Sequence, residues 1–513
     1  MKLKIFTLVL IVLSIYSVNA QNKKQPNVLM LVVDDWNDMI GAFGGNQAIT
    51  PNMDKLCKQG VKLTSTQTAG SYCTPSRTAL MTGIGPWNSG CYGEQPHHYN
   101  MPNQKTIPAL FQENGYVTYG GGKVYHHMPG YVDLKGYDEY FHWNPEQKKK
   151  GWGVFAWKNN PATPANIPAS DFGKTVYTNF DVCALPNEME KEMADTKMVD
   201  WAVDLIEKGF DKPFFLSAGL YSPHKPNFAP QKYFDLYPID KIRIPEIKED
   251  DLEDLPELVQ KMVAGKSRHT HQKVLKVENG WKRAIQGYLA AVSYADAQLG
   301  RLMDALENSP YHRNTIIVFW SDNGYHLGEK ECWAKHTLWE RTTNVPMIWS
   351  GKGIAKDKEY TGVISLLDIY PTLAAMCKLK GSGDFDGTDI SQQLKKPEKV
   401  VDRAVLTANK NGDNFSVYTN KWHYINYGFG KAEELYDAQN DHHEWNNLAG
   451  DPEYKTVIEQ MRTKLPENPS PVAKGKESIK MVCEGESFKW VEKTEAEKQR
   501  AKMKKKGKKK GKS

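Results

Sequence analysis

Acidic pairs follow two of the most apolar segments of the chain, and their side chains could bind a cation. Asp34 and Asp35 end one apolar run, and Asp322 and Asn323 end another. Ca²⁺ takes six to eight hard oxygen ligands, so two such pairs at neighbouring strand ends could converge on one ion. Acidic residues after strands also commonly form turns and caps. The pairs alone leave a metal site and a structural role both open.

Three apolar runs predict buried β-strands at 28–33, 213–218 and 314–321. Continuous apolar runs are typical of central strands that are covered on both faces. Helical stretches at 193–208 and 288–307 lie between them, and strands alternating with helices predict an α/β fold. Ligands of such sheets gather at the carboxyl ends of the strands, which is where the acidic pairs stand.

The character of the chain changes after about residue 390. A segment rich in Lys, Pro and Glu at 394–400 is typical of a linker, the runs 416–418 and 422–425 favour short antiparallel strands, and 454–465 fits a helix. We therefore expect a smaller C-terminal α+β unit. The expected divisions are a signal peptide (1–20), a catalytic domain (26–393), a C-terminal subdomain (400–490) and a disordered Lys-rich tail (491–513).

The N-terminus predicts export. A basic start precedes an apolar run at 5–13, and small residues end at Ala20. This order is typical of a signal peptide, and the run is too short for a transmembrane anchor. Export, to the periplasm or the medium, permits disulfides, and the cysteines other than Cys73 leave 15 possible pairings open.

The charge of the chain argues against nucleic acid as a partner. The net charge is +6, but the segment 489–513 contributes most of the positive charge, so the body of the chain is acidic. A nucleic-acid-binding body needs a basic face. The tail could tether the protein to a polyanion or simply be a solvated end.

The segment from Cys73 to Gly83, CTPSRTALMTG, carries the most specific pattern. It resembles the signature of the type I, formylglycine-dependent sulfatases, Cys/Ser-X-Pro-X-Arg followed by Leu-X-Thr-Gly. The resemblance implies an alkaline-phosphatase-like fold, with a large mixed sheet flanked by helices and a smaller C-terminal α+β domain on a short antiparallel sheet. It also implies oxidation of Cys73 to formylglycine by a maturation enzyme. The structural alternative is a buried or bridged cysteine.

Further patterns of the same family cover most of the chain. The resemblance assigns one Ca²⁺ to the acidic pairs and Cys73, and it assigns sulfate binding to Lys123 and Lys335. Arg77 would orient the hydrated aldehyde, one hydroxyl of which attacks sulfur. His224 would protonate the leaving sugar oxygen, and His126 would act as the base that restores the aldehyde. His98 is a further candidate for the substrate pocket. The implied metal ligands are Asp34, Asp35, Cys73, Asp322 and Asn323.

Two other chemistries fit the sequence poorly. The run Gly120–Lys123 lacks the glycine and hydroxyl residue that a phosphate-binding loop needs at 117 and 124. The His doublets at 97–98 and 126–127 lack the companion ligands of a zinc site.

The short motifs are similar to those of iduronate-2-sulfatase-like and marine polysaccharide sulfatases. We therefore expect a sulfatase of sulfated, algal polysaccharides such as ulvan or carrageenan, or of their oligosaccharides, with glycosaminoglycans second. A phosphomonoesterase or phosphodiesterase of the same fold, and a polyanion-binding protein without catalysis, are the alternatives.

Overall fold

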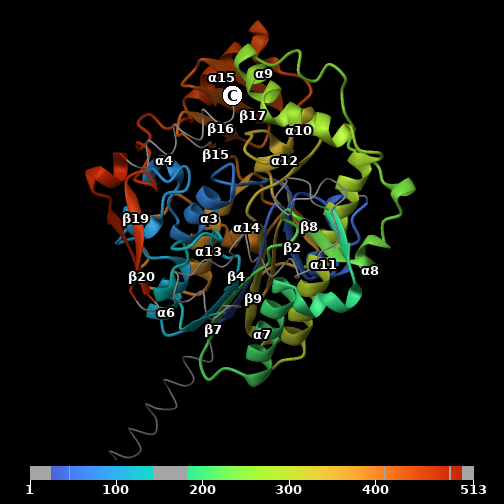
Figure 1. Cartoon of the computed structure of the whole chain (residues 1–513). Coiled ribbons are helices and arrows are strands. Elements are labelled where there is room, and N and C mark those ends of the chain that lie inside the picture. The colour runs from blue at the N-terminus through green and yellow to red at the C-terminus, as the bar shows by residue number, and fades with distance from the viewer. Residues whose placement is uncertain (1–24, 46, 142–181, 410, 485–486, 500–513) are drawn as a thin grey trace, which may run out of the picture.

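A mixed β-sheet lies at the centre of the structure, a computed structural model that describes residues 25–499 except 46, 142–181, 410 and 485–486 (Figure 1). The order of its eight strands is β13-β2-β12-β9-β1-β7-β4-β5. β1 pairs in parallel with β7 and β9, while β12 runs antiparallel to β9 and β2. The strands are β1 (Asn27–Val33), β2 (Gly60–Leu63), β4 (Val117–Gly122), β5 (Glu139–Phe141), β7 (Phe214–Gly219), β9 (Thr315–Ser321), β12 (Met347–Gly351) and β13 (Lys358–Tyr360).

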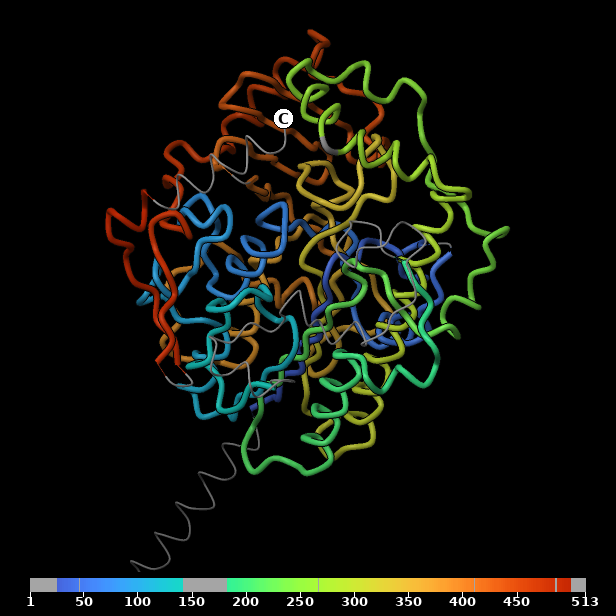
Figure 2. The backbone as a smooth tube through the Cα atoms, viewed as in Figure 1, coloured from blue at the N-terminus to red at the C-terminus, as the bar shows by residue number. Residues whose placement is uncertain are grey.

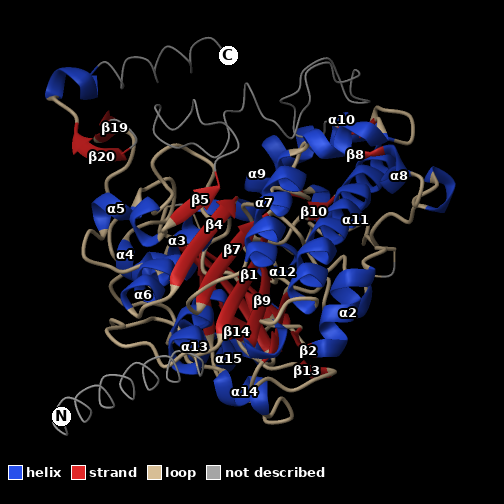
Figure 3. Ribbon diagram, turned by 90° about the horizontal axis from the view of Figure 1, so that it is seen from below, coloured by secondary structure: helices blue, strands red, loops and turns tan. Residues whose placement is uncertain are grey.

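Helices cover both faces of this sheet (Figure 3). Leu29 and Leu31 of β1 join a core with α2 (Pro51–Gln59), α7 (Ala194–Lys208) and α11 (Gly280–Glu307). Val28 and Met30 point the other way, into a core with α3 (Cys73–Thr82), α6 (Ile107–Glu113) and α13 (Ile369–Met376). The predicted α/β fold and the three predicted strands are confirmed. α11 begins before the expected residue 288, because the partly buried polar side chains Lys282, Arg283 and Gln286 of its first turns interrupt the apolar period.

A second, antiparallel sheet lies in the C-terminal part, as expected. It contains β15 (Val405–Ala408), β16 (Asn414–Tyr418), β17 (Trp422–Tyr427) and β18 (Ala432–Asp437). α15 (Lys455–Arg462) packs on it, with Ile458 and Met461 against Val417 and Leu435. The fold therefore combines the large mixed sheet with a small antiparallel one.

The ordered chain continues past residue 490, where a disordered tail was expected to begin. β19 (Ile479–Glu484) and β20 (Ser487–Glu492) form a hairpin, and residues 495–499 are helical. The hairpin is held because Trp490 packs on Tyr131 and Phe488 packs on His98. The start of the predicted tail is therefore wrong; residues 500–513 and the predicted signal peptide lie outside the described residues.

Small paired strands and short helices complete the described part of the chain. They are β3 (Thr66–Gln67) with β14 (Ile364–Ser365), β6 (Val182–Leu185) with β8 (Asn227–Pro230), β10 (His326–Leu327) with β11 (Trp333–Ala334), and helices α4 (Pro86–Ser89), α5 (His97–Asn100), α8 (Gln231–Phe234), α9 (Glu257–Ala264), α10 (Lys266–Leu275), α12 (Glu340–Thr343) and α14 (Ser391–Lys395). In this described part no helix is both long and apolar enough to span a bilayer.

The cysteines are not bridged. All seven lie within the described residues, none of them forms a disulfide, and Cys483 alone among them is exposed. None of the disulfide pairings that the sequence left open is therefore formed in this structure.

Close backbone packing shapes the edge of the sheet at which the parallel strands end. The Lys123 N–H donates to Gly219 O at 2.7 Å, just after β4 and β7 have run side by side. Gly122 has a φ of +67°, and a Cβ atom there would lie 1.9 Å from Gly219 O. Only glycine fits this position, and it sets the course of the chain into Lys123.

Replacing Gly122 by Ala should destabilise the protein by about 2–5 kcal/mol, because backbone strain adds to overpacking. Gly115→Ala is the matched control: its φ is also positive, at +84°, but nothing lies within 4 Å of the added Cβ. That variant should lose only the strain part, about 1–2 kcal/mol. Urea denaturation measures both, and equal losses would contradict the packing argument.

Candidate active site

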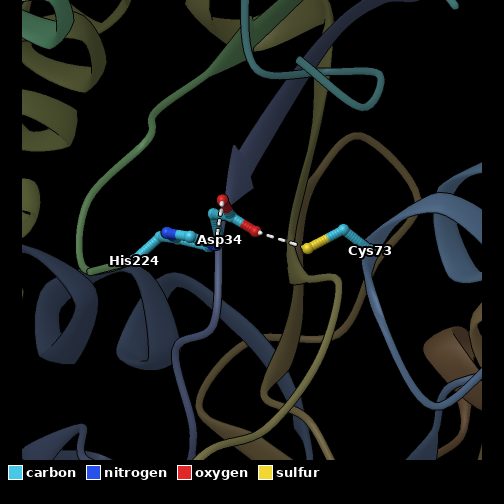
Figure 4. A group of neighbouring side chains, drawn as sticks. All are labelled: Asp34, Cys73 and His224. Atoms are coloured by element: carbon cyan, nitrogen blue, oxygen red, sulfur yellow. Dashed lines mark hydrogen bonds and ion pairs between the residues drawn. The ribbon is translucent and has the colours of Figure 1, made fainter. Parts of the chain in front are cut away.

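The carboxylates that follow β1 and β9 meet at one edge of the sheet. Asp34, Asp35 and Asp322 are fully buried. One oxygen of each lies, together with Cys73 Sγ, in a group whose atoms are all within 4.8 Å of one another. Asp34 Oδ1 is 3.3 Å from Cys73 Sγ, and Figure 4 shows Asp34 between Cys73 and His224. The structure thus brings together the residues that the sequence predicted at the strand ends.

Three cations neutralise these carboxylates. Arg77 donates from Nε to Asp322 Oδ2 at 2.8 Å, and its guanidinium lies 3.2 Å from Asp34 Oδ1. Lys123 bonds to Asp34 and Lys335 bonds to Asp35. All three cations are nearly or fully buried, so each pairing replaces the hydration that the charges have lost.

Cys73 begins α3, and the first turn of that helix is tied to the sheet edge that carries the carboxylates. Ser76 Oγ donates to Asp322 O at 2.7 Å and accepts from Thr68 Oγ1 at the same distance. These bonds fix the helix start against the end of β9. The start of α3 consequently holds Cys73 Sγ beside the carboxylates.

Lys335 reaches the same place from a strained loop. Its neighbours Ala334 and His336 both have positive φ values, +70° and +82°. Such conformations cost non-glycine residues free energy and persist where the surrounding structure imposes them. The loop places Lys335 Nζ 2.6 Å from Cys73 Sγ. A positive charge thus lies directly beside the sulfur atom.

His224 lies on the loop after β7, and hydrogen bonds to the side chain of Asp195 hold this loop in place. Asp195, at the start of α7, accepts from the N–H groups of Tyr221 (2.8 Å) and Ser222 (2.9 Å). His224 Nδ1 is 2.6 Å from Lys225 O; because a carbonyl can only accept, Nδ1 carries the proton. Nε2 then faces the carboxylates, 3.6 Å from Asp35 Oδ2 and 4.0 Å from Asp34 Oδ2.

Burial dominates the ionisation of these groups. It lowers the pKa of His224 well below its ordinary value, and the charges of Lys123 and Lys335 lower it further. Burial, opposed by the charge of Lys335, raises the pKa of Asp35 to about 6. Burial also raises the pKa of the Cys73 thiol far above its usual range. An unmodified thiol here stays protonated, and a protonated thiol is a poor nucleophile.

The donor set fits a hard divalent cation. Asp35 Oδ2 and Asn323 Oδ1 are buried oxygens that have no hydrogen-bond partner. The amide group of Asn323 donates to Gly70 O at 3.2 Å, which leaves its oxygen as the free ligand atom. With Asp34 and Asp322 they supply the carboxylate and amide oxygens that such cations prefer.

A pocket of about 800 Å³ opens above Cys73. Its lining includes His126, His224 and Lys335, all predicted site residues. Arg77 and Lys123 are not among the lining residues; they lie buried beneath, bonded to the carboxylates.

His98 does not reach this pocket within the described structure. Its Nε2 lies 3.1 Å from Val132 O, and its ring packs against His97 and Phe488. The expectation that His98 contacts substrate is therefore not supported by its position. The β19–β20 hairpin covers it, which the sequence did not indicate.

Sequence reasoning missed several residues of the site. Asp195 and Ser76 act through backbone bonds between segments distant in sequence, so no local pattern identifies them. The Pro- and Gly-containing stretch after residue 465 could have been recognised as a loop, but not as part of a pocket. Missed lining residues are Tyr72, Glu94, Gln95, His127, Lys225, His336, Lys476 and Glu477.

Comparison with known proteins places the chain in a family. The sulfatase family model matches residues 26–378, and a model of the C-terminal region of N-sulphoglucosamine sulphohydrolase matches residues 328–470. A sulfatase of Formosa agariphila is 37% identical over 86% of both chains. Human iduronate 2-sulfatase is 27% identical over 69% of both chains. An ulvan-active sulfatase of Formosa agariphila is 25% identical over 86% of this chain and 80% of its own.

Solved structures agree on the fold. A 2-O GAG sulfatase has a TM-score of 0.64 at 22% identity, with 86% of this chain and 91% of that chain covered. A phosphonate monoester hydrolase of Silicibacter pomeroyi has a TM-score of 0.71 at 16% identity, with 86% and 94% covered. The fold is thus the alkaline-phosphatase-like fold that the sequence implied.

The chain belongs to the sulfatase family. It is a hydrolase of sulfate esters, as the motif around Cys73 predicted. Members of this family generally use a formylglycine residue and a divalent metal.

Proposed function

We propose that this sulfatase is an exported enzyme that removes sulfate from sulfated polysaccharides or their oligosaccharides through a formylglycine at Cys73. The position of Cys73 carries the proposal: it is a buried lining residue of the pocket of about 800 Å³, beside the carboxylates and Lys335. Export rests on the N-terminal sequence pattern, and formation of the aldehyde requires a separate maturation enzyme.

The modification answers a chemical problem of the site. The buried thiol stays protonated and would attack poorly. The modified residue supplies a hydrated aldehyde, one hydroxyl of which is the nucleophile toward sulfur. Lys335, whose Nζ lies 2.6 Å from Cys73 Sγ, can hold that group in one orientation. We assign Arg77, which bonds to the neighbouring Asp34, to the same orienting role.

In the purified, matured protein, the peptide containing residue 73 should have lost one sulfur and two hydrogen atoms and gained one oxygen. Cys73→Ala should abolish hydrolysis of sulfate esters without loss of the fold. Mass spectrometry and assays on a sulfate ester and its phosphate counterpart test this. An intact thiol in an active enzyme, or a preference for the phosphate ester, would refute the proposal; the latter would favour the phosphatase alternative.

We further propose that the divalent metal is one Ca²⁺ ion. Asp34, Asp35, Asp322 and Asn323, with the modified residue 73, would hold it. Ligand atoms of the three aspartates and Cys73 lie within 4.8 Å of one another, and Asn323, next to Asp322, has a buried oxygen without a partner. When bound, the ion supplies positive charge that stabilises the sulfate oxygens in the transition state.

Calcium should raise the melting temperature, because an ion that binds only the folded state stabilises it, by about 2–3 kcal/mol at 100 times its dissociation constant. Asp322→Asn should remove most of this Ca²⁺-dependent shift. Asp304→Asn is the control, since Asp304 is exposed and pairs only with Lys55. Calorimetry after EDTA treatment measures the shift with and without Ca²⁺; a full shift in Asp322→Asn would exclude this ligand set.

The remaining charged residues have roles that follow from their positions. Lys335 lines the pocket and can bind the sulfate, while Lys123 keeps Asp34 paired from beneath. His224 presents Nε2 toward the reacting centre, so we assign to it protonation of the leaving sugar oxygen. Because Nδ1 already donates to Lys225 O, this role requires that Nε2 first takes up a second proton, so the acid is the imidazolium form. His126 also lines the pocket, and its Nδ1 is a buried atom without a partner, so we assign to it the role of the base.

Replacing His224 by Ala should reduce kcat about 100-fold or more on a sugar sulfate, as is typical of a lost general acid. An aryl sulfate should be affected much less, because its leaving group needs no proton. His98→Ala is the control and should change neither rate, since His98 lies outside the pocket. Equal losses on both substrates in His224→Ala would contradict the acid role.

The substrate is proposed from the pocket and the relatives. A polar pocket of about 800 Å³ has room for more than the sulfate group alone. One relative acts on ulvan and another is an iduronate sulfatase. We place algal polysaccharides such as ulvan or carrageenan first, and glycosaminoglycans second; hydrolysis of a panel of sulfated oligosaccharides decides between them.

A further inference from the structure

The outer part of the active-site pocket is built by a segment that neither family model covers. Residues 471–478, here called the C-terminal strap, follow the last matched residue, 470. The strap contributes Val472, Gly475, Lys476 and Glu477 to the pocket lining. Val472, Lys476 and Glu477 are exposed or partly exposed, as are Glu94 and Gln95, whereas Cys73 is buried, so these residues form the mouth of the pocket.

The strap is fixed against the helical segment near α4. In Figure 2 the red C-terminal chain runs beside the blue segment that follows α3. The Ala473 N–H donates to Gly90 O at 2.9 Å. Lys474 and Asn100 bond in both directions, at 3.1 and 3.0 Å. A Cβ on Gly90 would lie 2.4 Å from Pro471 O, so the two backbones are as close as a glycine allows.

The β19–β20 hairpin supports both sides of the mouth. Trp490 Nε1 donates to Gly130 O at 3.0 Å, next to the pocket residues 126–128. Lys493 Nζ donates to Lys476 O. On the facing side, Tyr131 Oη donates to Glu94 O at 2.7 Å. Lys476 and Glu94 therefore have well-defined backbone positions.

Lys476 is paired only weakly before substrate binds. Its Nζ lies 2.7 Å from Glu94 Oε2, and the two side chains are 40% and 47% exposed. Exposed ion pairs contribute at most about 1 kcal/mol. A substrate anion can therefore take the place of Glu94, or share Lys476 with it, at little cost.

Cations outnumber acidic side chains in the lining of the pocket. Lys225, Lys335 and Lys476 line it together with Glu94 and Glu477. The positive charges also act on His127, another lining residue. Burial lowers the pKa of His127 well below the ordinary value, and the charges of Lys123, Lys335, Arg77 and Lys476 lower it further. A substrate whose only charge is the scissile sulfate would leave the outer cation, Lys476, without a role in binding.

We propose that Lys476 binds a second anionic group of the substrate, a carboxylate or another sulfate next to the one that is cleaved. This inference rests on the proposed function. It specifies the substrate further, as a sulfated saccharide with a second anionic group next to the scissile sulfate. The C-terminal strap, outside the matched family regions, then selects among sulfated saccharides while the residues around Cys73 perform the chemistry.

The test compares three disaccharides that carry the same scissile sulfate and a neighbouring group that is neutral, a carboxylate or a second sulfate. In the matured enzyme, Lys476→Gln should reduce the ratio of kcat/KM for an anionic neighbour to that for the neutral one by about tenfold or more, through KM, as a lost charged hydrogen bond predicts. Lys476→Arg should restore the ratio. Comparison of the disaccharide that carries a carboxylate with the one that carries a second sulfate shows which anion Lys476 binds.

Lys474→Gln is the matched control. Lys474 lies on the same strap but bonds to Glu492 on the surface, outside the pocket. It should leave every ratio unchanged. An unchanged ratio in Lys476→Gln, or equal losses in both variants, would overturn the proposal.

Binding of the three disaccharides to the Cys73→Ala protein, measured by calorimetry, gives an answer independent of turnover. Lys476→Gln in that background should weaken binding of an anionic disaccharide about tenfold. If binding depends on Lys476 but the matured parent enzyme cleaves no sulfate ester, the proposed function fails and the anion subsite stands. If turnover is present and neither measurement depends on Lys476, the subsite alone fails.

Discussion

The rest of the structure depends on the burial of three carboxylates at adjoining strand ends. Two like charges 4 Å apart repel by about 4 kcal/mol at an effective dielectric constant of 20. Asp34, Asp35 and Asp322 can therefore coexist only if cations surround them. Arg77 and Lys335 come from segments far apart in sequence, and both are drawn to this point. The same requirement gathers these charged groups beside Cys73, where we propose that a metal ion and the substrate sulfate bind.

The backbone around the site reflects this requirement. Asp35, Ala334 and His336 all have positive φ values although none is glycine. Gly122 turns the chain where no side chain would fit. Each of these residues with a positive φ value either carries a charged group of the site, as Asp35 does, or is next to a residue that does, namely Lys123 or Lys335. The strain is tolerated because the parallel strands β1, β7 and β9 hold the loop ends rigidly.

The sequence predicted the parts of this arrangement that are local. β1, β7 and β9 are continuous apolar runs, and the carboxylates stand directly after two of them. The motif around Cys73 is likewise contiguous. His98 lies outside the pocket lining because its ring packs in part on Phe488, a residue nearly four hundred positions away, and no local pattern indicates that contact. Asp195 and the C-terminal strap were missed for the same reason: their roles exist only in tertiary contacts.

Chemistry and selectivity lie in different parts of this chain, and physical reasons favour that division. The residues around Cys73 are buried and mutually paired, so a change at Arg77 would remove the ion-pair partner of Asp322 and one of the two partners of Asp34, and cost several kcal/mol. Lys476 and Glu94 are half-exposed, and replacing either costs the fold little. The mouth of the pocket can therefore change between related enzymes while the base cannot. A C-terminal strap that is held through its backbone, as at Ala473 and Gly90, allows such changes in side chains without loss of its position.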